Sequence, residues 1–525
     1  MRQFALTFLA SATLLMAQGL DPAKLLQLPT DTWPTYNGDY SGRRFSPLTQ
    51  IDTSNVKHMT LAWVWRMNLG PGGGSPVAVK ATPLEVNGVL YFAVPDHAFA
   101  VDAVTGRELW HYKWTSSGGI HIGNRGFGMY GDWLYFETAD NFLVCLNAKD
   151  GTERWHVQIA DVKQEYFSTP APVVIRNHVI VGTGGDSLDV PGFLESRDPE
   201  TGNLQWRWNT TPRKGEPGAD TWPNPDAMEH GGGMTWMPGT YDPDLNLYYL
   251  GTGNPNPVMA GQGRTGTNLW TCSIVALNPD TGKMAWYFQS SPHDVHDWDA
   301  VQTPVLIDGT IDGKPRKLLA QASRNGYFFL LDRTNGKNIL SKPYGPINWS
   351  SGLDAKGQPI GNPAKYPHTE GTLVMPAAGG ITNWPPPAFS PQTGLFYVGT
   401  TDSYSMFFLT DTDKKPEGYG GRDVPLWSKA GLTAIDYQTG AIRWKHEYAG
   451  IGGGGSGVLA TAGGLVFAGD PMDNFIAFDA RSGDPIWHSR LTGSVANGPM
   501  AFERNGQEYV IVGAGDSLYA FTMMK

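Results

Sequence analysis

The stretch AVDAVTGRELW, residues 100–110, decides the fold because closely similar phrases recur along the chain. The other six are CLNAKDGTERW ending at Trp155, SRDPETGNLQW at Trp206, ALNPDTGKMAW at Trp286, LLDRTNGKNIL at Leu340, AIDYQTGAIRW at Trp444 and AFDARSGDPIW at Trp487. In each phrase an Asp or Asn opens a turn, a Gly supplies positive φ, and alternation resumes toward the closing position. Each phrase therefore predicts the end of one strand, a turn and the start of the next strand.

The spacing of these phrases predicts a propeller. Their Asp or Asn anchors stand at 102, 147, 198, 278, 332, 436 and 479, which gives spacings of 45, 51, 80, 54, 104 and 43 residues. The shorter spacings suit a four-stranded blade. The two longer ones imply insertions around 212–245 and 341–428, where Pro, Gly and Asn concentrate.

Two incomplete units remain at the ends of the chain. GPMAFERNGQEYVIVGAGDSLYAF, residues 498–521, supplies inner strands without an outer one, and NVKHMTLAWVW, residues 55–65, supplies a strand that no turn phrase precedes. Joining them would complete an eighth blade and remove an open sheet edge. The sequence therefore predicts an all-β, eight-bladed β-propeller with tryptophan-docking repeats, as one domain over 18–525 whose last blade is closed by the N- and C-terminal strands.

The N-terminus and the composition limit the location and the partners. MRQFALTFLASATLLMAQG places Arg2 before an apolar run over 4–16, with a small residue at Ala17, which predicts a signal peptide over 1–17 and a periplasmic protein. The run is shorter than the ~18–20 residues of a membrane span, and no later segment is apolar enough for a transmembrane anchor. A formal net charge of −10 argues against a nucleic-acid partner. Neither Cys145 nor Cys272 lies in CxxC or CxxCH, which excludes a zinc knuckle and a covalently attached c-type haem.

One charged stretch stands apart from the repeats. SPHDVHDWDAVQTP, residues 291–304, places Asp294, Asp297 and Asp299 with His293 and His296 within seven positions. A solvated acidic loop is one interpretation, and a cation or acid–base site is the other. A Trp inside the stretch and the apolar residues after it are unusual for a solvated loop.

The repeat resembles that of the quinoprotein alcohol dehydrogenases, which carry pyrroloquinoline quinone (PQQ), over nearly all of residues 30–525. Propeller scaffolds without a cofactor share this repeat, so the motifs between the repeats carry the resemblance. The charged stretch resembles the family's PHDxxD signature, which implies that Asp297 is the catalytic base and can also contact the metal. ASRNGYFFLLDRTNG resembles the segment whose arginine reaches the quinone carbonyls, here Arg324.

Five further motifs carry the resemblance in the family's order. They imply quinone contacts from Arg125 in GNRGFG, from Thr169 in STPAPVV and from Asn383 in TNWPPPAFSPQTG, a floor under the quinone ring from Trp236 in GGGMTW, and a metal-ligating amide from Asn254 in YYLGTGNPNP. PQQ carries three carboxylates and a flat ring, which match arginines and a tryptophan in chemical type.

The resemblance leaves the metal open between calcium and a lanthanide. An Asp two places after the catalytic one, here Asp299, marks the lanthanide-dependent branch of the family. Where the family has a metal-binding Glu, however, GTGGDSLDVPG places Ser187, flanked by Asp186 and Asp189. The expected ligands are Asn254, Asp297 and Asp299, and either flanking Asp could add a third carboxylate.

Other positions depart from the family's pattern. Gly119 and Ile120 replace a pair of adjacent cysteines, and Gly455 replaces a tryptophan, so we expect a roomier site. Lys80 replaces a glutamate and could pair with a PQQ carboxylate. We expect His293 and Asp294 to brace the loop, and His296 to be a packed ring.

The expected function is the periplasmic oxidation of a small alcohol to an aldehyde by PQQ. Electrons would pass to a separate acceptor such as a soluble cytochrome c, and a homodimer is compatible with the sequence. Two alternatives stay open: a quinoprotein for sugars or polyols, and a cofactor-free propeller scaffold that binds proteins.

Overall fold

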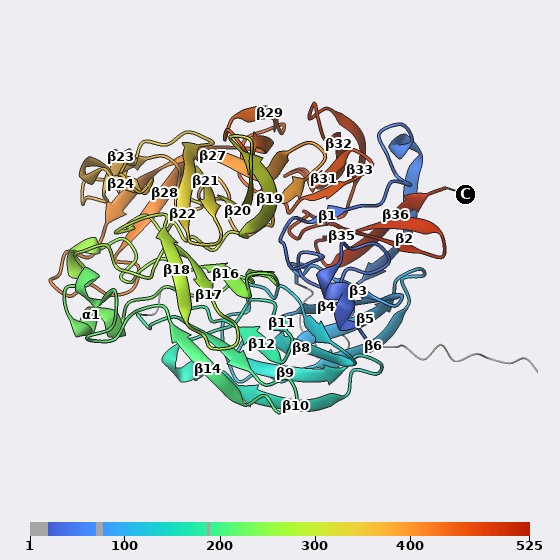
Figure 1. The fold of residues 1–525 in the computed structure, drawn as a ribbon, viewed down its shortest axis with the longest axis horizontal. Coiled ribbons are helices and arrows are strands. Elements are labelled where there is room, and N and C mark those ends of the chain that lie inside the picture. Colours follow the sequence, from blue (N-terminus) through green and yellow to red (C-terminus); the bar gives the residue numbers. More distant parts are fainter. Residues whose placement is uncertain (1–18, 70–76, 186–188, 525) are drawn as a thin grey trace, which may run out of the picture.

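The computed structural model describes residues 19–69, 77–185 and 189–524, so the predicted signal peptide over 1–17 lies outside the described residues. Within those ranges the chain forms eight sheets of four or five strands, arranged in a ring (Figure 1). The inner strands of the blades are buried, whereas the outermost strands, such as β10 (Glu153–Gln158), alternate between exposed and half-buried positions. Burial on both faces of the inner strands explains why they are rich in Val, Phe, Leu and Ala.

Each blade is given from the axis outward. The first blade contains β3 (Leu84–Val86), β4 (Val89–Val94), β5 (His97–Asp102) and β6 (Glu108–Lys113), and the second contains β7 (Gly128–Tyr130), β8 (Trp133–Glu137), β9 (Phe142–Asn147) and β10. The third contains β11 (Val173–Ile175), β12 (His178–Val181), β13 (Phe193–Arg197) and β14 (Leu204–Asn209), and the fourth contains β15 (Thr240–Asp242), β16 (Leu247–Gly251), β17 (Ser273–Leu277) and β18 (Met284–Gln289). The next three are β19 (Val305–Ile311), β20 (Lys314–Ala322), β21 (Tyr327–Asp332) and β22 (Lys337–Pro343); β25 (Thr372–Val374) and β26 (Ala388–Ser390), which both pair with β27 (Leu395–Leu409), then β28 (Gly421–Asp436) and β29 (Ile442–Glu447); β1 (Phe45–Ser46), β30 (Leu459–Thr461), β31 (Leu465–Gly469), β32 (Asn474–Asp479) and β33 (Pro485–Arg490). The eighth blade contains β34 (Met500–Arg504), β35 (Gln507–Ala514), β36 (Ser517–Met523) and β2 (Met59–Arg66).

The remaining elements are short. They are the hairpin β23 (Ser350–Leu353) and β24 (Pro359–Gly361), the helix α1 (Pro225–Glu229), and the 3-10 helices η1 (Pro22–Leu26), η2 (Val56–His58), η3 (Val162–Gln164), η4 (Ala219–Thr221), η5 (Gly261–Gly263) and η6 (Pro363–Lys365). The helices η4 and α1 lie in the first predicted insertion, and the hairpin, η6 and β25 lie in the second. The first predicted insertion therefore lies between the third and fourth blades up to β15, whereas the second also supplies β25, β26, β27 and part of β28 of the sixth blade.

Each predicted phrase joins the third strand of a blade to the fourth, and its tryptophan docks on the next blade. The Nε1 of Trp110 donates to the Ala148 carbonyl over 3.0 Å. A Cβ on Gly151, whose φ is +72°, would lie only 2.7 Å from the Trp110 ring. The indole thus packs on the turn of the following phrase, and that turn needs Gly both for its positive φ and for the close approach.

The same contact recurs around the ring. A Cβ on the turn glycine would approach the tryptophan of the preceding blade to between 2.5 and 2.7 Å in the pairs Trp63–Gly106, Trp206–Gly282, Trp286–Gly336 and Trp444–Gly483. Leu340, the one phrase ending without Trp, occupies the equivalent place against Gly440. The repeat therefore encodes the contacts between blades as well as the strands themselves.

The two ends of the chain close the eighth blade, as predicted. Strand β2 pairs antiparallel with β36, from Met59 opposite Met523 to Arg66 opposite Ser517, and the two lie side by side in Figure 1. The Nε1 of Trp63 in β2 donates to the Ala103 carbonyl over 3.2 Å, which docks this composite blade on the first one.

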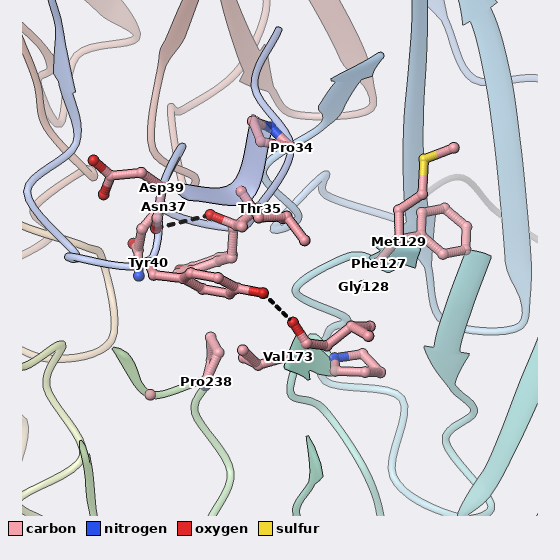
Figure 2. Close-up of a pocket in the computed structure, with 15 residues that line it drawn as sticks. Pro34, Thr35, Asn37, Asp39, Tyr40, Phe127, Gly128, Met129, Val173 and Pro238 are labelled. Atoms are coloured by element: carbon pink, nitrogen blue, oxygen red, sulfur yellow. Dashed lines mark hydrogen bonds between the residues drawn. The ribbon is translucent and has the colours of Figure 1, made fainter. Parts of the chain in front are cut away.

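The segment over 33–46 runs through the centre of the ring and bonds to one inner strand after another. Its carbonyls accept from the backbone N–H groups of successive blades, namely Tyr40 from Tyr241, Ser41 from Leu306, Arg43 from Phe389 and Arg44 from Ala460. Figure 2 shows a small pocket beside this segment, where the Tyr40 hydroxyl reaches toward β11 and donates to the Val174 carbonyl over 2.5 Å. The segment thereby fastens the blades to one another at the axis.

Two further features concern the cysteines and the helices. Cys145 and Cys272 are both buried and free, so neither forms a disulfide. In the part of the chain that the structure describes, none of the helices is both long enough and apolar enough to cross a membrane.

Candidate active site

Two carboxylates of the charged stretch meet one guanidinium. Asp297 and Asp299 are 7% and 1% exposed, and Arg324, which follows β20, is 7% exposed. The Nη2 of Arg324 donates to Asp297 over 2.9 Å and its Nη1 donates to Asp299 over 3.0 Å. This fork arrangement fixes both carboxylates, and the guanidinium compensates part of their negative charge. The solvated-loop interpretation of the stretch is therefore wrong.

Asp299 is the hub that connects three of the predicted residues. Its Oδ1 accepts from the backbone N–H of Asn254 over 2.6 Å, and its Oδ2 accepts from Nε1 of Trp236 over 3.0 Å. Since Oδ2 also accepts from Arg324, a single carboxylate orients the predicted floor, the predicted ligand segment and the predicted quinone-contacting arginine.

The backbone of the loop is held in an unusual conformation. Asp297 has a φ of +69°, in the left-handed region that few non-glycine residues adopt. The Oδ2 of Asp294 accepts from the Trp298 N–H over 3.0 Å, and the Asp294 carbonyl accepts from the buried Arg264 over 2.5 Å. These bonds brace the loop, as predicted for Asp294, and maintain the conformation that directs Asp297 toward Arg324.

His296 is a packed ring, as predicted. It stacks on Trp298 with centroids 4.3 Å apart, and its Nε2 bonds to the Lys365 carbonyl over 2.8 Å. Burial lowers the pKa of His296, so the ring is neutral near pH 7 and donates to the carbonyl.

Arg125 lies between two indoles. Its guanidinium carbon is 5.2 Å from the Trp236 ring centroid and 5.0 Å from that of Trp384. Burial lowers the pKa of Arg125 to about 10, yet the group stays charged at neutral pH. Its Nε and Nη1 are buried and have no hydrogen-bond partner among the described residues. A buried cation with open donors indicates an anion site.

Thr169 and Lys80 adjoin the same two indoles. The Thr169 hydroxyl donates to the Trp236 carbonyl over 3.2 Å, and the Thr169 carbonyl accepts from the Arg125 N–H over 3.0 Å. The Nζ of Lys80 is 6.0 Å from the Trp384 ring centroid and donates to the Ile122 carbonyl over 2.5 Å. Burial, and secondarily the Arg125 charge, lowers the pKa of Lys80.

Trp384 is the main residue that sequence reasoning missed. The preceding residue, Asn383, was predicted instead; its Nδ2 donates to the Gly379 carbonyl over 3.1 Å and its Oδ1 accepts from the Trp384 N–H over 2.9 Å. Asn383 thus shapes the turn that presents Trp384 to Arg125. The signal was available, since a tryptophan next to a motif asparagine in a Pro-rich loop has few packing partners in its own blade.

The predicted metal ligands are only partly assembled. The Oδ1 of Asn254 is buried and has no hydrogen-bond partner in the described residues, and the backbone N–H of the same residue donates to Asp299. Asp189 instead accepts from the Gly418 N–H over 2.7 Å, in an interaction with another loop. Asp186 and Ser187 lie outside the described residues. Over 19–69, 77–185 and 189–524, no cluster of three or more His, Cys, Asp or Glu side chains is placed to hold a metal ion.

Comparison with protein families gives two matches along the chain. A family model described as the PQQ glucose/ethanol/alcohol dehydrogenase β-propeller domain matches residues 33–343. A second, described as outer membrane protein assembly factor BamB, matches residues 428–523, which hold the last repeats but none of the charged site.

Individual relatives cover nearly the whole chain. A quinohemoprotein alcohol dehydrogenase of Pseudomonas putida, ADH IIB, is 36% identical over 97% of this chain and 77% of its own length. The lanthanide-dependent methanol dehydrogenase of Methylacidiphilum fumariolicum is 32% identical over 96% of this chain and 90% of its own. The crystal structure of the quinohemoprotein alcohol dehydrogenase from Comamonas testosteroni superposes with a TM-score of 0.89 at 32% identity, over 96% of this chain and 82% of that one. The chain belongs to the quinoprotein alcohol dehydrogenases, oxidoreductases that use PQQ to oxidise alcohols.

Proposed function

We propose that PQQ binds beside Arg125, Trp236 and Trp384, and that the substrate hydroxyl meets Asp297. The observation that carries this proposal is the Arg125 guanidinium, which is buried between two indoles with two open donors. A tricarboxylate with a flat ring supplies both the missing acceptors and the stacking surface. The Nζ of Lys80 lies 6.0 Å from the Trp384 ring centroid and adds a second cation for a carboxylate of PQQ.

When bound, PQQ supplies the electrophilic quinone that takes up the two electrons of the alcohol. Asp297 accepts the hydroxyl proton as general base. Its contact with Arg324 stabilises the ionised carboxylate and orients it, because the same guanidinium donates to Asp297 and to Asp299. Arg324 would also supply positive charge to stabilise the negative charge that develops on the quinone.

We propose that a metal ion binds at Asn254, Asp297 and Asp299. The support is the buried Asn254 Oδ1, which has no hydrogen-bond partner among the described residues, in a residue whose backbone N–H donates to Asp299. A hard cation prefers such oxygen ligands and acts as a Lewis acid toward a quinone carbonyl. The count of two carboxylates, Asp297 and Asp299, suits calcium, whereas the presence of Asp299 itself favours a trivalent lanthanide, which is the ion we propose.

We further propose that residues 1–17 direct export to the periplasm and that electrons leave to a separate cytochrome c. The apolar run over 4–16 supports export, and the lack of CxxCH around Cys145 and Cys272 supports an acceptor on another chain.

Reconstitution tests the proposal directly. Purified protein is titrated with PQQ in calcium or in lanthanum, and uptake is followed by absorbance before alcohol is added to reduce the quinone. We expect tight uptake, reduction by primary alcohols, and weaker uptake in Arg125→Leu. Protein that takes up no quinone with either metal would instead be a cofactor-free scaffold, and reduction by sugars alone would make it a polyol enzyme.

A further inference from the structure

The segment over 115–122 borders the cations of the proposed quinone site and belongs to no strand or helix. Each of its residues is half-buried or exposed, so buried side chains do not hold it in place. At its C-terminal end, Gly123 and Asn124 lead directly to Arg125. Because the segment has neither regular structure nor a core of its own, its position depends on a small number of polar contacts.

Asp140 holds the first half of this segment. Its Oδ2 accepts from the backbone N–H of Ser117 over 2.8 Å and from the Ser117 hydroxyl over 2.9 Å, and its Oδ1 accepts from Nε1 of Trp114 over 2.9 Å. These bonds fix the chain up to residue 117. The second half, over 118–122, is the part that leads to Arg125, and it needs a contact of its own.

His121 and Asp96 supply that contact. Nε2 of His121 lies 2.7 Å from Oδ2 of Asp96, and Nδ1 lies 3.2 Å from the Gly119 carbonyl. Both ring nitrogens face acceptors, which a doubly protonated, charged ring satisfies with its two N–H groups. Asp96 stands in the turn between β4 and β5, where its carbonyl accepts from the Trp114 N–H over 2.9 Å. The Asp96 side chain is 16% exposed, so the pair is partly shielded from water.

The residue after His121 contacts Lys80. The Ile122 carbonyl accepts from Nζ of Lys80 over 2.5 Å, and the same Nζ lies 6.0 Å from the Trp384 ring centroid. The Lys80 stem passes over Gly123, where an added Cβ would lie 2.7 Å from its Cδ. A lysine side chain has many rotamers to lose when it is fixed. The Ile122 carbonyl therefore selects the conformation that keeps the ammonium beside Trp384.

The surroundings of Lys80 make this carbonyl important. Burial, and secondarily the positive charge of Arg125, lowers the pKa of Lys80. Both causes disfavour an ammonium at this place until an anion is bound. The Ile122 carbonyl offers a partial negative charge that offsets part of this penalty. Since Ile122 follows His121 directly, the His121–Asp96 pair reaches Lys80 through one peptide unit.

We propose that Asp96 and His121 are positioning residues for the quinone. By holding the Ile122 carbonyl, they orient Lys80 toward a carboxylate of PQQ. The inference rests on the proposed function and adds two residues that act on the quinone without touching it. Their loss should weaken the binding of PQQ and leave turnover of the loaded protein unchanged.

Titration with PQQ in calcium, and separately in lanthanum, tests the two residues through the absorbance of the bound quinone. Lys80→Met should raise the Kd of PQQ by about 10–100-fold, the effect of one charge-assisted hydrogen bond. Asp96→Asn and His121→Ala should each raise it by about fivefold, as for a partly exposed ion pair. Asparagine suits position 96, where φ is +64°, so that variant adds no backbone strain. At saturating PQQ, kcat should equal that of the wild type in both.

A matched control removes a charge from an ion pair at the periphery. Nη2 of Arg154, on the outermost strand β10, lies 2.5 Å from Oε2 of Glu200, in the turn that follows β13. Glu200→Gln should leave the Kd of PQQ unchanged. The thermal midpoint of each apo-protein verifies that the variants are folded.

A double-mutant cycle separates positioning of Lys80 from a general weakening of the site. If the His121–Asp96 pair acts through Lys80, adding Asp96→Asn to Lys80→Met should raise the Kd by less than about 1.5-fold, instead of the fivefold seen in the wild-type background. A pair that only stabilises the local fold would show the full loss in both backgrounds.

Hydrogen exchange gives a readout that needs no quinone. In apo-protein the amides of 117–123 should exchange faster in Asp96→Asn and His121→Ala than in the wild type. Glu200→Gln should not change their rate. Mass spectrometry of the peptide that covers this segment measures the difference.

Four results would overturn the inference. The Kd values of Asp96→Asn and His121→Ala could equal that of the wild type, with or without faster exchange. The fivefold loss could persist in the Lys80→Met background, or Lys80→Met itself could leave the Kd unchanged. Exchange of the segment could also stay as slow as in the wild type. Wild-type protein that takes up no PQQ with either metal removes the proposed function and the inference with it, whereas the other results leave the proposed function intact.

Discussion

The contacts at the periphery of this propeller are repeated from blade to blade, whereas those of the charged site are not. At the periphery one contact, a tryptophan on the turn glycine of the next blade, is repeated around the ring. The charged site follows no repeat: Asp297, Asp299 and Arg324 come from two inter-strand loops, and each bond between them occurs once. The repeated contact stabilises the fold without depending on any single copy, whereas each residue of the site has a role that no other residue duplicates. The consequences of substitution should differ accordingly.

The largest effect should come from Asp297→Asn, which keeps the shape of the side chain and removes the base. Turnover by the PQQ-loaded protein should fall by about 10²–10⁴ while the thermal midpoint stays close to that of the wild type. Because Asp297 is also a proposed metal ligand, metal affinity is titrated separately on the same samples. Full activity would remove the central residue of the mechanism.

Trp286→Ala should reverse this pattern. Trp286 is buried, its Nε1 donates to the Arg333 carbonyl over 3.0 Å, and its ring packs on Gly336. Its loss should lower the free energy of unfolding by about 3–5 kcal/mol, with turnover per quinone-loaded molecule retained. Urea unfolding measures the first and burst titration the second; Leu204→Ala, at a residue 49% exposed, should change unfolding by less than about 0.5 kcal/mol. A stable but inactive Trp286→Ala would break the distinction between periphery and axis.

Asp299→Ala separates the two carboxylates of the site. It leaves the base and removes a proposed ligand together with the acceptor of Trp236 and Asn254. Affinity for a light lanthanide should fall by about 10–100-fold, while calcium-supported quinone reduction persists. Parallel titrations with the two metals decide the result, and an equal loss with both would show that Asp299 does not select the ion.

Glu85→Gln should have the smallest effect. Among the described residues the Glu85 carboxylate forms no ion pair, and its Oε1 accepts from the Gly88 N–H over 2.6 Å. Glu85 is fully buried in β3, and burial raises its pKa from an ordinary 4.5 to about 8. Unfolding returns the group to its ordinary value, so its contribution to stability is complete below pH 4.5 and is lost as pH rises toward 8. The variant should therefore be stabilised relative to the wild type by about 1–3 kcal/mol at pH 7 but not at pH 4.5. Urea midpoints at both values measure the difference; identical pH dependence in the two proteins would contradict it.

What the sequence predicted follows the same division. The blades, the insertions and the composite eighth blade could all be predicted from the sequence, because the pattern of strand, turn and docking residue occurs seven times. The charged site was accessible in part: motifs placed Asp297, Arg324, Trp236 and Arg125 together by resemblance, and the structure brings them into one cluster.

The remaining features depend on contacts that no local pattern encodes. Asp189 bonds to a backbone N–H 229 positions away, in a loop of the second insertion, so its neighbours in sequence gave no sign of that partner. Trp384 joins the site only because the long inserted segment turns back on Arg324 at Gly380. The hub role of Asp299 needs three donors from separate segments, and spacing alone could not identify them.

The pairing of β2 with β36 also constrains the timing of maturation. A ribosome releases β2 well before β36, so β2 waits for its neighbour while the intervening blades are made. Before β36 is made, Trp63 can dock on the turn of the first blade, but β2 has no neighbouring strand to pair with. The central segment over 33–46 also cannot contact every blade. Stable loading of the proposed quinone should therefore require β36, and a chain terminated before β36 should be unable to retain it.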